Sequence, residues 1–237
     1  MRVQVIIPTY NERENLPGLV RAILARDGYD VMVVDDNSPD GTGAIADDLA
    51  REFPGRVEAI HRKGPRGLGR SYVEGLQRAI GGTADVICQM DADWSHDPQY
   101  LPALVAATAS HDVVIGSRYL QGVSVVNWPL RRLVLSTFAN RYIRAVTRLR
   151  AKDCTSGYRC WRRETLARLR LDRMVSDGYA FLVEMLYEAA RRGAKIGEVP
   201  IIFIERRQGA SKLSNAVLLE SALTPWRLVL RDKLGSG

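Results

Sequence analysis

Five short apolar runs, each followed by polar turn residues and a helical pattern, fill the first 117 residues of this 237-residue chain. Because they do not alternate apolar with polar residues, the runs are typical of strands buried on both faces. Helical patterns between the runs indicate parallel connections. The sequence therefore predicts an α/β fold, with a mostly parallel central sheet flanked by helices. The runs are Val3–Ile7, Val31–Val34, Val57–His61, Val86–Met90 and Val113–Gly116.

Caps and stops bound the predicted helices. Asn11 followed by Glu14 fits the N-cap of a helix that runs to about Arg26, and Asp40 is expected to cap the next helix. Three further helices are predicted after residue 118, and the last is interrupted by Pro225. They span residues 130–149, 175–192 and 213–231, with a strand at 199–204 between the second and the third.

Polar residues follow four of the predicted strands directly. Ligands of parallel sheets bind beyond the carboxyl ends of the strands, so these residues should gather at one edge. This convergence predicts a binding site at the carboxyl edge of the sheet. The polar stretches are Thr9–Glu12, Asp35-Asp36, Asp91–Asp93 and Ser117-Arg118.

Charge is unevenly distributed along the chain. Residues 1–117 hold 11 basic and 17 acidic residues, a net charge of −6, whereas residues 118–237 hold 23 and 10, a net charge of +13. An acidic first half can hold a cation, and a basic second half can hold anions or lie against an anionic surface. Nucleic acid is a rival partner for the basic half, but no recognition motif is present and aromatic residues make up only 7% of the chain.

The pair Asp91 and Asp93 is the strongest candidate for metal binding. Two carboxylates two residues apart, just past a buried strand, can share one hard cation such as Mg²⁺, which prefers oxygen ligands. The alternative is an ordinary polar strand end, with Asp93 or Asp97 capping the next helix. The other polar stretches at the same edge favour the metal site.

Two further stretches are ambiguous from residue type alone. Asp36 could accept from a ribose hydroxyl or a base N–H, or it could serve the local turn. Residues 64–69 form a glycine cluster that is neither a Walker loop nor a dinucleotide fingerprint. A tight turn before a helix is its expected role, and its N–H groups could also face a ligand. A separate group of basic side chains could bind phosphate, or it could simply form a solvated face. Its members are Arg118, Arg131, Arg132, Arg206, Arg207 and Lys212.

Several classes of protein do not fit the sequence. No apolar stretch reaches the roughly 18–20 residues that a membrane span requires. The three cysteines and three histidines are too few and too scattered for a disulfide framework or a zinc module. The N-terminal apolar run lacks the cleavage site of a signal peptide, so a reducing, cytoplasmic setting is the expectation.

Four motifs together resemble the GT-A glycosyltransferases of family 2. They are VIIPTYNE (5–12), VDDNSPDGT (34–42), MDAD (90–93) and GSRY (116–119). Within that family, Asn127-Trp128, the stretch TSGYR (155–159) and the stretch around Glu205–Leu213 resemble dolichol- or polyprenol-phosphate mannose synthases. The resemblance implies a GT-A catalytic domain over residues 1–215. It leaves a C-terminal amphipathic helix and tail, without a transmembrane span, over residues 213–237.

The resemblance also implies roles for individual residues. Asp91 and Asp93 match metal ligands for Mg²⁺ or Mn²⁺, and with Arg118 and Arg206 they are the expected catalytic residues. Arg132 and Ser136 match positions for the acceptor phosphate, whereas Ser95 stands where some members carry a further metal ligand, Gln. The positions expected to bind the nucleotide sugar are Pro8, Tyr10, Glu12, Val34, Asp36, Asp91, Ala92, Asp93, Arg118, Arg206 and Lys212.

The implied reaction is inverting transfer of mannose from GDP-mannose to a polyprenyl (dolichyl-type) monophosphate, which releases GDP. The resemblance implies a peripheral enzyme at the cytoplasmic face of a membrane, with a separate membrane-anchoring subunit as a possible partner and no nucleic acid. A glucosyltransferase that uses UDP-glucose is the nearer alternative. A non-enzymatic basic module that binds membrane or nucleic acid is the more distant one.

Overall fold

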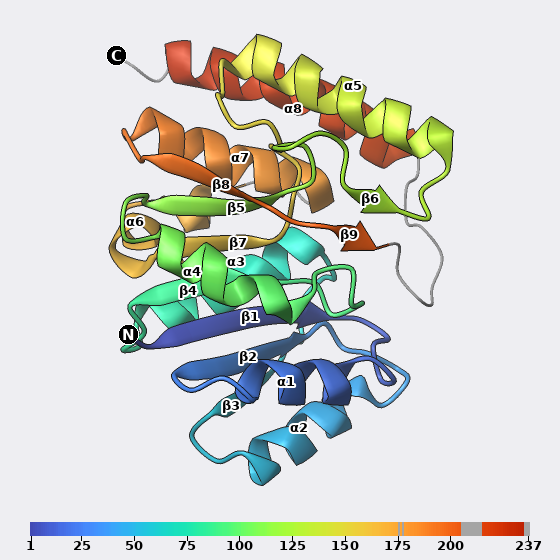
Figure 1. Cartoon of the computed structure of the whole chain (residues 1–237), viewed down its shortest axis with the longest axis vertical. Helices are drawn as coiled ribbons and strands as arrows, with labels where there is room; N and C mark the ends of the chain where they lie inside the picture. The colour runs from blue at the N-terminus through green and yellow to red at the C-terminus, as the bar shows by residue number, and fades with distance from the viewer. Residues whose placement is uncertain (175, 177, 205–214, 235–237) are drawn as a thin grey trace.

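The computed structural model describes residues 1–174, 176, 178–204 and 215–234. Its centre is a seven-stranded sheet with the order β3-β2-β1-β4-β7-β5-β8 (Figure 1). All neighbouring strands pair in parallel except β7, which is antiparallel to both β4 and β5. The mostly parallel sheet predicted from the sequence is thereby confirmed. The strands are β1 (Val3–Thr9), β2 (Tyr29–Asp35), β3 (Val57–His61), β4 (Val86–Gln89), β5 (Val113–Ser117), β7 (Arg159–Arg162) and β8 (Ile196–Pro200).

Helices cover both faces of the sheet, which therefore has a hydrophobic core on each side. Within β1, Val5 and Ile7 pack in one core with Leu16 of α1, while Ile6 packs in the other with Tyr72 of α3. The apolar runs lack a polar face because both faces are buried. The helices are α1 (Leu16–Leu24), α2 (Thr42–Glu52), α3 (Leu68–Ile80), α4 (Leu101–Ala107), α5 (Leu130–Thr147), α6 (Arg163–Ala167), α7 (Gly178–Arg191) and α8 (Asn215–Leu234), with 3₁₀ turns at Pro98–Tyr100 and Leu171–Arg173.

Helices α5 and α8 lie side by side as an outer layer at one end of the sheet (Figure 1). The Tyr142 hydroxyl of α5 donates to the Ala222 carbonyl of α8 over 2.6 Å. Arg231 anchors α8 to α7 through Glu184, at 2.8 Å. A two-stranded parallel sheet, β6 (Val125–Val126) with β9 (Phe203–Ile204), lies near the start of α5 (Figure 1).

A glycine allows α3 to approach the sheet closely. A Cβ atom at Gly75 would lie 2.7 Å from Ile6 Cγ2 and 2.9 Å from Val34 Cγ2, closer than real contacts allow. Only glycine therefore permits this packing of α3 against β1 and β2. The packing fixes the position of the loop that enters α3 at the carboxyl edge.

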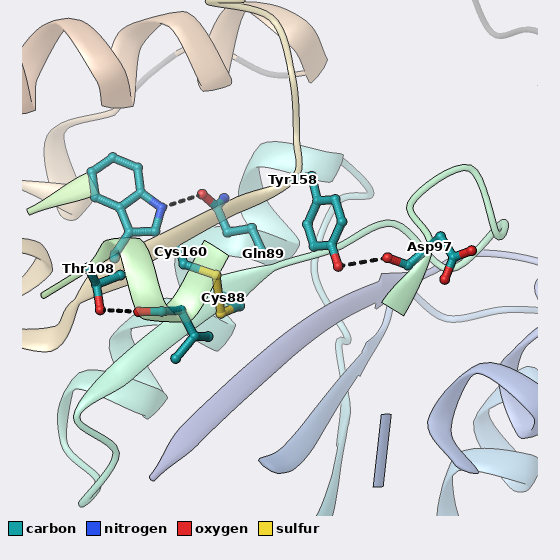
Figure 2. Close-up of a disulfide and its surroundings, with 8 residues drawn as sticks. Cys88, Gln89, Asp97, Thr108, Tyr158 and Cys160 are labelled. Atoms are coloured by element: carbon teal, nitrogen blue, oxygen red, sulfur yellow. Dashed lines mark hydrogen bonds between the residues drawn. A yellow bond between two sulfur atoms is a disulfide. The ribbon is translucent and has the colours of Figure 1, made fainter. Parts of the chain in front are cut away.

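The cysteines depart from the expectation that they form no disulfide framework. Cys88 of β4 and Cys160 of β7 face each other in the antiparallel register, are fully buried and form a disulfide (Figure 2). Neighbouring side chains also tie the strands together, because Trp161 Nε1 donates to Gln89 Oε1 over 2.8 Å (Figure 2). The sequence separation of 72 residues hid this pair, since only the insertion of β7 beside β4 brings the two cysteines together.

The first helix starts later than expected. Asn11 has a positive φ of 60° and does not cap a helix; α1 begins at Leu16, and Glu12 accepts at its backbone carbonyl from Asn15 and Leu16. The Asn11–Glu14 capping box is therefore wrong, because the chain turns sharply here to leave β1. Gly41, and not Asp40, is the N-cap residue of α2 and makes no side-chain cap. Asp40 lies one residue earlier, where its Oδ1 accepts from the Thr42 N–H over 3.0 Å.

Differences at the C-terminal end follow from tertiary packing. The expected strand at 199–204 is divided between β8 and β9, which belong to different sheets. Helix α8 continues through Pro225 to Leu234. No described helix combines the length and the apolar character that a membrane crossing requires.

Candidate functional site

A cavity of about 760 Å³ opens at the carboxyl edge of the sheet. One end, here called the polar end, is lined by residues that follow β1, β2 and β4, together with Arg118 after β5. Its other end, the apolar end, is lined by residues of α5, α7 and α8. Since β7 runs antiparallel, the chain that precedes it also reaches this edge and adds Thr155–Gly157 to the lining. The predicted convergence of polar residues is confirmed.

Asp36 lies at the polar end in a fixed, buried position. Its Oδ1 is paired with Arg62 Nη1, and its Oδ2 accepts from the Gly67 backbone N–H over 2.8 Å. Arg62 also donates to Glu74 over 3.0 Å. The loop between β3 and α3 is thus attached to the residue that follows β2, and Asp36 is held at a fixed place in the cavity lining.

The glycine-containing loop also contributes a basic residue to the cavity. The Arg66 guanidinium lies 4.7 Å from the ring centroid of Tyr10, and its Nη1 donates to the Tyr10 hydroxyl. Both residues line the polar end. From the sequence, a turn was the favoured role of this loop, with a ligand contact through its N–H groups left open; the structure places Arg66 and Gly67 in the cavity wall.

Asp91 and Asp93 follow β4 and face different partners. Asp91 Oδ1 accepts from the Tyr72 hydroxyl at 3.2 Å, and Asp93 Oδ1 accepts from the Ser95 hydroxyl at 2.5 Å. Burial, and then the nearby Asp91 charge, hold the pKa of Tyr72 well above its usual value, so this phenol remains a donor. Both carboxylates line the cavity.

The turn that carries these carboxylates is held by His96. The ring is fully buried, stacks on Tyr158 at 4.9 Å and meets Phe203 edge-on at 5.6 Å. Its Nδ1 accepts from the Asp91 N–H over 3.0 Å. Burial lowers the pKa of His96 despite the attraction of Asp91, which favours the neutral ring that such an acceptor requires.

Arg118 is locked in a buried ion pair with Asp153. Its Nε and Nη2 donate to the two carboxylate oxygens over 2.7 and 2.6 Å, and Nη2 also reaches the Thr155 hydroxyl at 2.8 Å. Burial alone would raise the pKa of Asp153, but the charge and hydrogen bonds of Arg118 lower it below the usual value. The pair presents a fixed guanidinium at the cavity wall.

Next to Arg118, α5 supplies a second guanidinium and a hydroxyl. Arg132 lies 4.2 Å from the Trp128 ring centroid, and Ser136 accepts from the Tyr119 hydroxyl over 2.8 Å. In the described part of the chain, the buried indole Nε1 of Trp128 has no hydrogen-bond partner. Buried N–H groups are nearly always satisfied, so a ligand with acceptor oxygens would suit this position.

The apolar end extends between α5, α7 and α8. It contains no charged side chain among its described lining residues. Such a surface favours a hydrocarbon group over a second polar ligand. These lining residues are Leu135, Phe138, Ala139, Tyr142, Ile143, Ala180, Leu182, Val183, Ala222 and Thr224.

Most of the sequence-predicted site residues meet in this one cavity. Val34 does not, because it is fully buried within β2 and packs in the core. Arg206 and Lys212 lie outside the described residues. The predicted residues that line the cavity are Pro8, Tyr10, Glu12, Asp36, Asp91, Ala92, Asp93, Arg118, Arg132 and Ser136.

Sequence reasoning missed three residues that hold the site together: Arg62, His96 and Asp153. Arg62 directly follows β3, so the rule that polar residues after parallel strands converge could have found it. The partners of His96 and Asp153 depend on how the chain returns to the sheet, and no local pattern indicates them.

The donor set at Asp91 and Asp93 fits a hard divalent cation. Carboxylate oxygens are the ligands that Mg²⁺ and Mn²⁺ prefer. Among the described residues, no group of three or more His, Cys, Asp or Glu side chains could hold a metal by itself. A cation here would therefore take its remaining ligands from water or from a bound phosphate.

Comparison with known proteins shows the family of this chain. The profile of Glycosyl transferase family 2 matches residues 4–170. Polyprenol monophosphomannose synthase of Mycolicibacterium smegmatis is 46% identical over 235 residues, which cover 98% of this chain and 89% of that protein. Undecaprenyl-phosphate mannosyltransferase of Micrococcus luteus is 45% identical over 234 residues, which cover 98% and 96%.

Solved structures share the fold at lower sequence identity. Glucosyl-3-phosphoglycerate synthase from Mycobacterium tuberculosis, solved with Mn²⁺, uridine diphosphate and glucosyl-3-phosphoglycerate, matches with a TM-score of 0.67 and 18% identity. The match covers 99% of this chain and 80% of that one. The fold is that of the GT-A glycosyltransferases. On the profile match and the near full-length relatives, this chain belongs to glycosyl transferase family 2.

Proposed function

We propose that this enzyme transfers mannose from GDP-mannose to a polyprenyl monophosphate and releases GDP. The observation that carries the proposal is the continuity of the cavity, whose polar end leads directly into an apolar end lined by α5, α7 and α8. A lipid phosphate needs both environments, one for its head group and one for its chain. The names of the two relatives at 46% and 45% identity support mannose as the transferred sugar and a polyprenyl phosphate as the acceptor.

The reaction requires little acid–base chemistry from the protein. A phosphate monoester has a second pKa near ~6 and is largely dianionic at neutral pH, so it can attack without losing a proton. One of its oxygens forms a bond to the anomeric carbon while the bond from that carbon to the GDP oxygen breaks, and the configuration inverts. The main tasks of the side chains are therefore to hold the two substrates in line and to stabilise the departing charge.

In this proposal, the acceptor phosphate lies beside α5. Arg132 and the Ser136 hydroxyl line that part of the cavity, and Arg118 faces it from the end of β5. Trp128 Nε1, which lacks a partner in the described chain, would donate to a phosphate oxygen. Arg118 cannot move freely, because Asp153 holds it, so it contributes positioning and charge at a fixed place.

Asp91 and Asp93 would hold a divalent cation, Mg²⁺ or Mn²⁺. When bound, such a cation acts as a Lewis acid that stabilises negative charge on a diphosphate leaving group. Tyr72 and Ser95 orient the two carboxylates by hydrogen bonds, and His96 fixes the backbone at Asp91. Arg206 and Lys212 are expected to neutralise the same diphosphate; this expectation stays a prediction.

The long acceptor suggests that the enzyme works at a membrane surface, and we place this contact at the cytoplasmic face. Exposed apolar side chains on α5 and α8 support a peripheral contact, among them Phe138 at 65% and Trp226 at 52% exposure. The solvent face of α5 continues into Arg141, Arg144 and Arg148, which suit anionic lipid head groups. A separate anchoring subunit is not required by these features and remains a prediction.

A substitution at the apolar end tests the proposal. Ile143→Trp would fill part of the space meant for the lipid chain while leaving the polar end intact, so the KM for undecaprenyl phosphate should rise at least about tenfold with an unchanged KM for GDP-mannose. Val146→Trp, at a half-buried α5 position outside the cavity lining, is the matched control. Equal KM values for the lipid in wild type and Ile143→Trp would contradict the proposal.

A further inference from the structure

The loop between β3 and α3 places an arginine fork at the polar end of the cavity. Arg66 lines the cavity, and its guanidinium covers the ring of Tyr10 at 4.7 Å. The side chain is otherwise exposed to solvent, so it can turn from the ring face without breaking a buried contact. Neither the family motifs nor the expected nucleotide-binding positions include this residue.

The same loop is attached to Asp36. The backbone N–H of Gly67, the residue after Arg66, donates to Asp36 Oδ2 over 2.8 Å. A carboxylate oxygen can accept more than one hydrogen bond, so Asp36 keeps acceptor capacity toward the cavity. A donor fork and an acceptor carboxylate therefore occupy one end of the cavity and are held there as one unit.

These two groups complement the edges of guanine. Guanine presents two adjacent acceptors, O6 and N7, and a guanidinium can donate to both at once. Its N1–H and N2–H donors match a carboxylate. Uracil offers a carboxylate only its N3–H, and it has no second acceptor next to O4 on the outer edge. The fork therefore gains two bonds from guanine but only one from uracil.

We propose that Arg66 determines the choice of guanine over uracil in the sugar-nucleotide donor, an inference that rests on the proposed function. On binding, the guanidinium moves from the Tyr10 ring to the O6/N7 edge, and the ring face that it covered can stack on the base. Asp36 accepts from N1–H and N2–H. Arg62 cannot take this part, because Asp36, Glu74 and the Pro65 carbonyl occupy its guanidinium.

Calorimetric titration with three nucleotides tests this role. The nucleotides are GDP, UDP and 7-deaza-GDP, which lacks only the N7 acceptor, and all titrations contain Mn²⁺. Arg66→Ala should weaken GDP binding about tenfold and UDP binding only about threefold, because guanine loses two bonds to the guanidinium and uracil loses one. Arg66→Lys should lose most of the same preference, because an ammonium group cannot form the parallel pair of bonds. Arg70→Ala removes an exposed charge one turn into α3, outside the cavity lining, and should bind like wild type.

The deaza nucleotide makes the assignment specific to one edge of the base. Wild type should bind it more weakly than GDP, and Arg66→Ala should reduce its affinity by a clearly smaller factor than that of GDP. Equal losses for GDP and UDP would mean that Arg66 acts only through its charge, and this result would overturn the inference. The inference would also be overturned if Arg66→Ala reduced the affinities for GDP and for 7-deaza-GDP by the same factor.

Failure of the inference and failure of the proposed donor give different results. If wild type prefers GDP and Arg66→Ala keeps that preference, the role of Arg66 is wrong while the GDP donor stands. If wild type prefers UDP, the proposal of a GDP-linked donor is wrong, and the proposed role of Arg66 is wrong as well. Thermal unfolding of each variant shows whether it is folded, and the conservative Arg66→Lys variant provides the readout if Arg66→Ala is not.

Discussion

The Nδ1 atom of His96 accepts a hydrogen bond from the backbone N–H of Asp91 over 3.0 Å. The sheet does not hold this part of the chain, because β4 ends at Gln89. A buried side chain, wedged between Tyr158 and Phe203, therefore fixes the turn that presents Asp91 and Asp93. The position of the expected metal ligands depends on a residue that need not touch the metal.

Replacement of His96 should weaken metal binding according to the acceptor that the new side chain offers. His96→Ala removes the side-chain acceptor of the part-buried Asp91 N–H, and loss of such a hydrogen bond costs about 1–3 kcal/mol. His96→Asn places an amide oxygen near the former Nδ1 and should recover most of the Mn²⁺ affinity, measured by electron paramagnetic resonance in the presence of GDP. If the Asn variant binds Mn²⁺ no better than the Ala variant, the hydrogen bond does not position the carboxylates.

The Arg118–Asp153 pair should matter for stability as well as for activity. Asp153→Asn leaves a buried guanidinium without its counter-ion and should reduce the free energy of unfolding by about 3–5 kcal/mol, measured by urea denaturation. The double variant Arg118→Met/Asp153→Leu should regain most of that stability without regaining turnover. Glu52→Gln, in an exposed pair with Arg21, should unfold at nearly the wild-type urea concentration. Wild-type stability in Asp153→Asn would show that the pair is not buried as described.

The same pair predicts a pH dependence. Because folding lowers the pKa of Asp153, the ionised carboxylate adds stability above the unfolded-state pKa of about 3.9. That contribution is lost as the pH falls through the lower folded-state pKa. The difference in unfolding free energy between wild type and Asp153→Asn should therefore be constant between about pH 5 and about pH 7, and it should shrink below about pH 4. A difference that grows on acidification would contradict the assignment.

The disulfide between Cys88 and Cys160 should stabilise the fold measurably. It closes a loop with a sequence separation of 72, for which chain entropy gives about 4 kcal/mol. Mass spectrometry after alkylation in denaturant without reductant should find one alkylated cysteine, Cys154. In the folded protein, Cys154 should resist alkylation, because burial raises its pKa to about 12. Three alkylated cysteines in unreduced protein would contradict the disulfide.

Binding to anionic vesicles should depend on the exposed arginines of α5. Replacement of Arg141, Arg144 and Arg148 by Ala should reduce flotation with phosphatidylglycerol vesicles, by about 1 kcal/mol per residue, and the loss should vanish at high salt. The control replaces Arg13, Arg51 and Arg78, which are also exposed and lie in the first 80 residues of the chain, outside α5. Equal flotation of the two triple variants would mean that α5 does not face the membrane.

The parallel part of the sheet could be predicted because its strands are continuous apolar runs with helices between them. The cavity followed from the same rule, since residues after parallel strands meet at one edge. Strand β7 could not be predicted in this way, because two of its four residues, Arg159 and Arg162, are basic and the strand lacks an apolar pattern. Arg159 is fully buried nonetheless, since its guanidinium donates to the carbonyls of Cys154, Ser156 and Leu182.

Tertiary contacts explain the other departures. Val34 was expected to bind nucleotide from its motif, but Gly75 brings α3 against it and places it in the core. Asp153 stands in an arginine-rich stretch and gives no local signal, because its partner Arg118 lies 35 residues earlier. Sequence patterns therefore indicated which residues line the cavity better than they indicated which residues hold them in place.

Product analysis tests the central claim most directly. Purified protein is incubated with Mn²⁺, undecaprenyl phosphate and either GDP-mannose or UDP-glucose. The products in the lipid fraction are then identified by mass spectrometry. The account predicts a lipid phosphate carrying one hexose with GDP-mannose, dependent on Asp93, and little or none with UDP-glucose. Hexose transfer from UDP-glucose alone, or no transfer from either donor, would contradict it.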